Sequence, residues 1–172
     1  VMRVRKAVEH GNAVSSGVNI ARDLVNMPAK VMTPSALAEA AERIAKEGGK
    51  NISLKVLERE ECEAFGMGAY LAVDDGSDTP LKFIHLTYTP ERATRKRFAV
   101  VGKGVTFDSG GLSLKSGDAM MTMKCDMAGA ASVIAVFKVI ARLQPKAEVH
   151  GIFAAAYNMP GPDAYKPGDV LK

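Results

Sequence analysis

The pattern of apolar and polar positions predicts three long helices. Over residues 5–25, apolar side chains recur every three or four positions, which is the spacing of one helical face. A second helix is expected from Pro34 to the glycines at 48–49, because Thr33 can act as its N-cap and proline suits the first turn. A third helix, strongly apolar and with small side chains along one side, is expected over residues 127–143.

Shorter stretches have the character of strands. Residues 52–57 alternate between apolar and polar positions, and residues 81–88 and 98–102 are also strand-like. Residues 149–156 form a continuous apolar run, which is typical of a buried strand in a parallel sheet. A short helix is expected over residues 59–65. Because strands alternate with helices, the chain is predicted to be an α/β domain with a mostly parallel or mixed sheet flanked by helices.

The composition excludes several classes of protein. The chain has 172 residues, of which 47% are hydrophobic and 24% charged, so it is not a disordered or low-complexity segment. The formal net charge is only +4, and the densest basic cluster, residues 92–97, contains no aromatic residue. A solvated loop is therefore favoured there over a nucleic-acid-binding arm, and nucleic acid is not indicated as a partner.

No apolar run is long enough to span a membrane. Cys62 and Cys125 form no Cys-x-x-Cys pair, which is typical of a reducing, cytoplasmic location.

The candidate chemistry lies in a glycine-rich stretch, residues 103–118, that follows the third predicted strand. In open α/β sheets, ligands bind at the carboxyl ends of strands, and long loops in a compact domain are usually functional. The stretch contains Lys103, Asp108 and Lys115, and it leads to Asp126 just before the last predicted helix. These four side chains are the first candidates for a site.

Three interpretations of this stretch remain open from the residues alone. A phosphate-binding loop is disfavoured because Gly102 and Gly104 lack the third glycine of the dinucleotide fingerprint, and the P-loop spacing is absent. A metal site would use Asp108 and Asp126 as hard oxygen ligands, and a carboxylate-rich site without histidine favours two metals that share carboxylates. A lysine can ligate only as the neutral amine, whereas a charged lysine can stabilise an oxyanion. The third interpretation is an ordinary surface loop with weak ion pairs.

Three longer motifs narrow these interpretations. Residues 101–115 read VGKGVTFDSGGLSLK, residues 123–131 read MKCDMAGAA, and residues 158–169 begin with NMP and end with AYKPGD. In this order they resemble the metal-binding motifs of the leucyl aminopeptidase, or cytosol aminopeptidase, family. With weaker matches upstream, the resemblance covers nearly the whole chain.

The resemblance implies a fold, an activity and a set of site residues. The family has an α/β catalytic domain behind a separate N-terminal domain, forms homo-hexamers, and removes N-terminal residues, often leucine, from peptide substrates. Two divalent metal ions per subunit, zinc or manganese, are the implied cofactors. By resemblance, Lys103 is the amine ligand of the looser metal, Asp126 is a second ligand of that metal, and Asp108 is shared between both metals. Lys115 resembles the charged catalytic lysine, and Met123 aligns with an apolar wall of the substrate-binding pocket.

The sequence also departs from the family pattern. Ser116 stands where proline is common, and the later Asn-Thr-Asp-Ala-Glu-Gly-Arg motif, which supplies two more carboxylate ligands and an arginine, does not occur in the chain. We therefore expect residues 1–30 to be a linker helix, and residues 31–172 to be the N-terminal part of a metallopeptidase catalytic domain truncated before its last ligand motif. The expected function is a metal-dependent aminopeptidase whose isolated fragment is inactive. The alternatives are a non-catalytic structural or interaction domain of the same fold and, less favoured, a nucleotide-binding domain.

Overall fold

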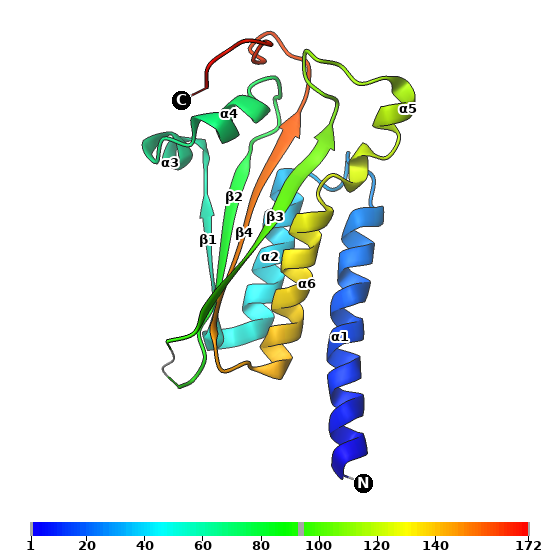
Figure 1. Ribbon diagram of the computed structural model, residues 1–172, viewed down its shortest axis with the longest axis vertical. Coiled ribbons are helices and arrows are strands. Elements are labelled where there is room, and N and C mark those ends of the chain that lie inside the picture. The colour runs from blue at the N-terminus through cyan, green and yellow to red at the C-terminus, as the bar shows by residue number, and fades with distance from the viewer. Residues whose placement is uncertain (1, 93–94, 172) are drawn as a thin grey trace.

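Four strands form one mixed sheet in the order β1-β2-β4-β3 (Figure 1). The computed structural model describes residues 2–92 and 95–171. β1 and β4 each pair with β2 in the antiparallel sense, whereas β3 and β4 are parallel. This confirms the mixed form of the predicted sheet, and it shows that the apolar run of β4 is parallel to a neighbour on one side only. The strands are β1 (Ile52–Leu57), β2 (Lys82–Tyr88), β3 (Arg97–Asp108) and β4 (Glu148–Asn158).

The three predicted long helices are confirmed, with ends close to the expected residues. They are α1 (Met2–Asn26), α2 (Pro34–Gly48) and α6 (Ala128–Leu143), and the Thr33 hydroxyl accepts a hydrogen bond from the amide of Ala36 as predicted for an N-cap. None of the described helices is both long and apolar enough to cross a bilayer. The short helices are η1 (Gly49–Asn51), α3 (Arg59–Ala64), α4 (Gly68–Asp74), α5 (Gly117–Met120) and η2 (Met123–Cys125).

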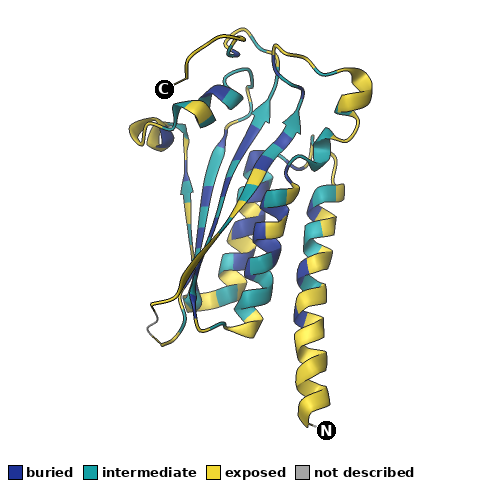
Figure 2. Cartoon of the chain, viewed as in Figure 1, coloured by how far each residue is buried: buried dark blue, intermediate teal, exposed yellow. Residues whose placement is uncertain are grey.

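The main core lies between one face of the sheet and helices α2 and α6. Alternate residues of the strands, such as Ile84 and Phe153, are fully buried there against Leu37 of α2 and Phe137 of α6. Helix α1 packs alongside α6, and the amino-terminal half of α1 is exposed (Figure 2). Because α2 and α6 form a single layer on this face, each helix has one side toward the core and one toward solvent, which produces the helical periodicity in the sequence.

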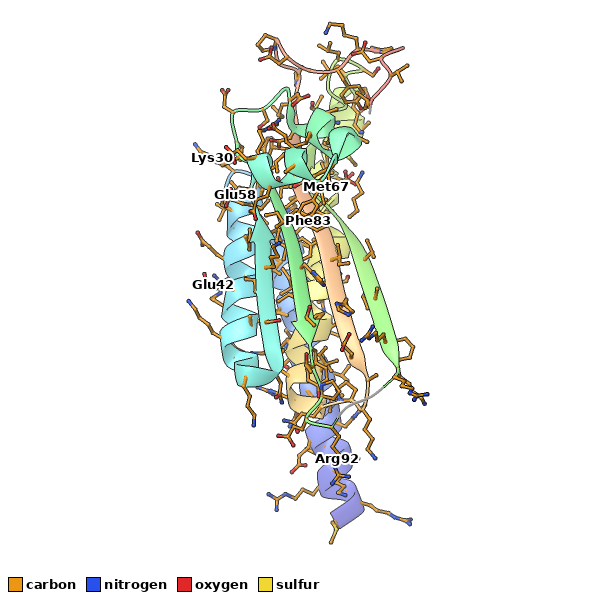
Figure 3. All side chains as sticks on the ribbon, turned by 90° about the vertical axis from the view of Figure 1, so that its left-hand side faces the viewer. Lys30, Glu42, Glu58, Met67, Phe83 and Arg92 are labelled. Atoms are coloured by element: carbon orange, nitrogen blue, oxygen red, sulfur yellow. The ribbon has the colours of Figure 1, made fainter. Side chains whose placement is uncertain are left out.

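The opposite face of the sheet is covered only in part. Helices α3 and α4 close its end near the carboxyl end of β1, where Met67 packs with Phe83 in a small second core (Figure 3). Further along this face the side chains are more accessible, and Val101 of β3 is 72% exposed. Of the basic cluster at 92–97, positions 93–94 lie outside the described residues, and Arg97 begins β3, where it forms an ion pair with Glu148.

The structure corrects the predicted end of β3. The strand was expected to end at residue 102 and to be followed by a loop, but it continues to Asp108, so Lys103 lies within a strand. The glycines that suggested a loop are required by close packing. A Cβ atom at Gly102 would lie 2.3 Å from the carbonyl carbon and oxygen of Gly129, at the start of α6. Only glycine permits this approach of two backbones.

Candidate functional site

A β-bulge in β3 brings Lys103 and Asp108 to the same side of the strand. Lys103 pairs with Ala154 and Asp108 with Asn158, but the register shifts between Val105 and Phe107, so the strand contains one extra residue. In a regular strand, residues five positions apart point to opposite faces, whereas one extra residue restores the same side. The bulge therefore makes a shared site possible for two residues whose spacing alone argues against it.

Asp126 reaches Lys103 because the start of α6 rests on β3. A Cβ atom at Gly129 would lie 2.5 Å from the amide nitrogen of Lys103, so only glycine fits here as well. Asp126 lies two residues before α6, and its Oδ2 is 3.0 Å from Lys103 Nζ. This approach lacks the angles of a hydrogen bond, and Asp126 Oδ2 is buried without any hydrogen-bond partner. The Lys103 ammonium therefore lies close to this oxygen without satisfying it as a hydrogen-bond acceptor.

The carboxylate of Asp108 is held by three donors. Its Oδ2 accepts a hydrogen bond from Lys115 Nζ at 2.7 Å, and its Oδ1 accepts from the Gly110 amide at 2.9 Å and from Asn158 Nδ2 at 2.7 Å. Burial alone would raise the pKa of Asp108, but the hydrogen bonds from Lys115, Gly110 and Asn158 outweigh it, and the pKa lies below its usual value. Asp108 is therefore an anion fixed in one orientation.

The loop after β3 places Lys115 beside Asp108 through its own backbone. The amide of Lys115 donates to the carbonyl of Ser109 at 2.9 Å, and both the amide and the hydroxyl of Ser109 donate to the carbonyl of Asn158. Gly110 has a φ of 89°, a conformation that L side chains rarely adopt. This turn folds the chain back, so that a lysine seven residues after Asp108 meets its carboxylate.

Met123 lies at the start of η2, three residues before Asp126. Its side chain is half-buried, and its carbonyl accepts a hydrogen bond from the Asp126 amide at 3.2 Å. The structure thus joins Lys103 with Asp126 and Asp108 with Lys115, while no hydrogen bond or ion pair among the described residues links the two pairs. The role of Met123 in substrate binding stays a prediction.

Asn158 is a site residue that the sequence reasoning missed. It begins the motif at residues 158–169, for which the resemblance implied no residue role. In the structure its side chain binds Asp108 and its carbonyl anchors Ser109. The available signal was its position at the end of an apolar strand, since parallel neighbours end at the same edge of a sheet.

The two lysine–carboxylate pairs fit a metal centre only in part. Among the residues that the structure describes, no three His, Cys, Asp or Glu side chains gather in a way that could hold a metal ion. Each carboxylate instead has an ammonium group within 3.0 Å, and the buried Oδ2 of Asp126 lacks a hydrogen bond. Hard carboxylate oxygens beside an amine are a suitable, though incomplete, ligand set for zinc or manganese.

Comparison with known proteins decides the family. The family model described as "Cytosol aminopeptidase family, catalytic domain" matches residues 19–172. The chain belongs to the cytosol aminopeptidase family. The predicted resemblance is thereby confirmed. A probable cytosol aminopeptidase of Acaryochloris marina is 54% identical over 166 residues, which are 96% of this chain and 33% of the relative. One of Sulfurihydrogenibium sp. is 50% identical over 170 residues, or 99% of this chain and 33% of the relative.

Solved structures agree with the family assignment and with the fold. The bottromycin maturation enzyme BotP in complex with Mn is 40% identical, with a TM-score of 0.90 over 97% of this chain and 36% of that one. A mutant of tomato leucine aminopeptidase is 39% identical, with a TM-score of 0.89 over 99% of this chain and 32% of that one. The chain thus spans about a third of the length of its cytosol aminopeptidase relatives.

Proposed function

We propose that this chain supplies part of the metal centre and the catalytic lysine of an aminopeptidase that removes N-terminal residues, leucine preferred, from peptides. The observation that carries the proposal is the pairing of two lysines with two carboxylates where β3, β4 and the start of α6 meet. An exposed surface pair would need no such construction. Here a bulge, a glycine–glycine contact and a turn at positive φ all serve to assemble the four side chains.

In this proposal Lys103, Asp108 and Asp126 would hold two divalent ions, zinc or manganese, with Asp108 shared between them. When bound, such ions would polarise the scissile carbonyl and lower the pKa of a water molecule. The unpartnered Oδ2 of Asp126 supports its role as a ligand. Lys103 Nζ would bind as the neutral amine, because an ammonium group has no lone pair to donate.

The remaining side chains would act on the substrate directly. Lys115 is a hydrogen-bond donor to the ionised Asp108, and a charged lysine there can stabilise the negative charge that develops on the scissile carbonyl oxygen. Asn158 Nδ2 donates to Oδ1 of Asp108 and Lys115 Nζ donates to Oδ2, so both carboxylate oxygens are held in place by neighbouring side chains. Met123 would form an apolar wall for the N-terminal side chain of the peptide.

The whole protein is expected to be a cytoplasmic homo-hexamer, and the 172-residue chain alone is expected to bind metal weakly and to turn over no leucine amide. The reason lies in the ligand set, because the described residues offer only two carboxylates in this region. The alternative is a non-catalytic domain of the same fold. The two functions differ in whether the full-length protein hydrolyses peptides at all.

Hydrolysis of leucine amide with Mn²⁺ or Zn²⁺, measured on the full-length protein that contains this chain, tests the proposal. Asp108→Asn and Lys115→Met are each expected to lower kcat at least a hundredfold. Asp118→Asn and Lys50→Met change exposed residues of the same types and should leave kcat unchanged. Near-normal turnover of Asp108→Asn would refute its role as a metal ligand, and absence of turnover by the wild-type full-length protein would favour the non-catalytic alternative. Rapid metal-dependent turnover by the 172-residue chain alone would refute the incomplete ligand set.

A further inference from the structure

The carboxyl end of β4 extends beyond its neighbour β2. The pairing of the two strands ends at Lys82 and Ala155, whereas β4 stays paired with β3 as far as Asn158. The Asn158 carbonyl accepts hydrogen bonds from the start of the loop after β3, so the amide of the preceding residue, Tyr157, faces the side that β2 has left. This amide needs an acceptor from another element.

Helix α4 takes the place of β2 at this end of the sheet (Figure 1). The hydroxyl of Tyr70 donates to the Ala155 carbonyl at 2.8 Å, and Oδ1 of Asp74 accepts from the Tyr157 amide at 3.0 Å. Tyr70 and Asp74 are four positions apart on the helix and therefore share one face, just as Ala155 and Tyr157 share one side of the strand. Two matched side chains thus replace a strand neighbour.

The Asp74 carboxylate is held firmly in this place. It is buried, and its Oδ2 lies 3.6 Å from the Arg59 guanidinium. A Cβ atom at Gly76, in the turn after α4, would overlap the carbonyl oxygen of Met159, so the two segments are in close backbone contact. Burial of a carboxylate is costly unless it is paired and hydrogen-bonded, and the Tyr157 amide supplies such a bond.

The amide that Asp74 binds is next to the residue that orients a candidate metal ligand. Asn158 Nδ2 donates to Oδ1 of Asp108 at 2.7 Å, and the Asn158 carbonyl accepts from both the amide and the hydroxyl of Ser109. One series of contacts therefore leads from α4 through Tyr157 and Asn158 to Asp108. Without the bond to Tyr157, the end of β4 would be held on the β3 side only.

We propose that Asp74 is a positioning residue for Asp108. By binding the Tyr157 amide it fixes the end of β4, and with it the side chain and carbonyl of Asn158. The consequence for catalysis rests on the proposed function, in which Asp108 is a shared metal ligand. Loss of a group that directly orients a metal ligand lowers affinity or activity about 10–100-fold, and because Asp74 acts through Asn158 we expect about tenfold.

NMR of the ¹⁵N-labelled 172-residue chain tests the positioning without any need for activity. Asp74→Leu has a similar size and removes the acceptor, whereas Asp74→Asn keeps an acceptor oxygen. In Asp74→Leu the side-chain amide resonances of Asn158 should shift, and the Ser109 amide should exchange with solvent at least about tenfold faster. Both signals should stay as in wild type in Asp74→Asn and in Asp78→Leu, which changes an exposed carboxylate of the same segment.

The Tyr157 amide is the internal reference of this experiment. It loses its acceptor in Asp74→Leu, so its resonance should shift whether or not the effect reaches the site. A shift at Tyr157 with unchanged signals from Asn158 and Ser109 would show that Asp74 stabilises only its own contact, and the proposal would fail.

Kinetics of the full-length protein with leucine amide and Mn²⁺ provide the second test. Asp74→Leu should lower kcat about tenfold and leave KM nearly unchanged, because Asp74 does not touch the substrate in this proposal. Asp74→Asn should restore most of kcat. Ile44→Val truncates a buried side chain of α2 in the main core and should destabilise the protein without lowering kcat, which separates positioning from general destabilisation.

A double variant tests whether Asp74 acts through Asn158. Asp74→Leu combined with Asn158→Ala should lower kcat by less than the product of the two single effects, since residues in one network are not independent. Effects that multiply, or a normal kcat for Asp74→Leu, would overturn the proposal. Absence of turnover by the wild-type full-length protein would instead refute the proposed function, and the NMR comparison would still decide whether Asp74 positions Asn158.

Discussion

Replacement of Gly129 by alanine tests the contact that positions the candidate site. The added Cβ would lie 2.5 Å from the Lys103 amide nitrogen and 3.1 Å from the carbonyl and α carbons of Gly102. Ordinary contacts of a Cβ begin near 3.4 Å, so the start of α6 and strand β3 must separate by about 0.9 Å. The obstructing atoms belong to the backbone, so no side-chain rotation can relieve the clash.

The expected cost of Gly129→Ala follows from two opposing effects. Overpacking of a tight contact costs about 1–3 kcal/mol of unfolding free energy, whereas alanine in a helix gains up to about 1 kcal/mol over glycine. Gly129 lies in the first turn of α6, where the helical gain is smallest. We therefore expect a net loss of about 2 kcal/mol, together with a weaker contact between Lys103 and Asp126.

Urea unfolding followed by circular dichroism measures this difference, with Gly11→Ala as the matched control. Gly11 lies within α1, and a Cβ there would meet no atom within 4 Å, so alanine should stabilise the chain by up to about 1 kcal/mol. The sign of the change should thus differ between two identical substitutions in helices. A Gly129→Ala chain at least as stable as wild type would refute the inferred backbone contact.

Two further predictions concern single hydrogen bonds. Thr33→Ala should lower the unfolding free energy by about 1 kcal/mol in urea titrations, since the Ala36 amide loses its cap. Asp74→Ala should cost about 1–3 kcal/mol, because it leaves the half-buried amide of Tyr157 without this acceptor. Burial raises the pKa of Asp74 despite the opposing effects of the Tyr157 amide and Arg59, so ionisation of Asp74 destabilises the fold as the pH rises through its folded pKa. Asp74→Asn keeps the acceptor oxygen and cannot ionise, so its unfolding free energy relative to wild type should increase as the pH is raised from acid to neutral. A difference in unfolding free energy that does not change with pH would contradict this prediction.

Periodicity predicted helices α1, α2 and α6 because each of them buries one side, whereas β4 was predicted from a continuous apolar run. It failed at β3, where Gly102 and Gly104 interrupt the apolar pattern. Those glycines serve contacts with residues far away in the sequence, Gly129 and Ala154, which no local pattern can reveal. The same limit explains why Asn158 was missed, since its role depends on the parallel pairing of β3 with β4.

The bulge in β3 connects one buried polar residue to the geometry of the site. Thr106 lies between the two ends of the register shift and is fully buried, and its hydroxyl donates to the carbonyl of Ala156 at 3.2 Å. A bulge disrupts the hydrogen-bond ladder locally, and a buried polar group without a partner is costly. Valine would fill the same space but could not donate this bond. Threonine therefore stabilises the irregularity that turns Lys103 and Asp108 to one side, and a position that looks like core packing supports the placement of the candidate ligands.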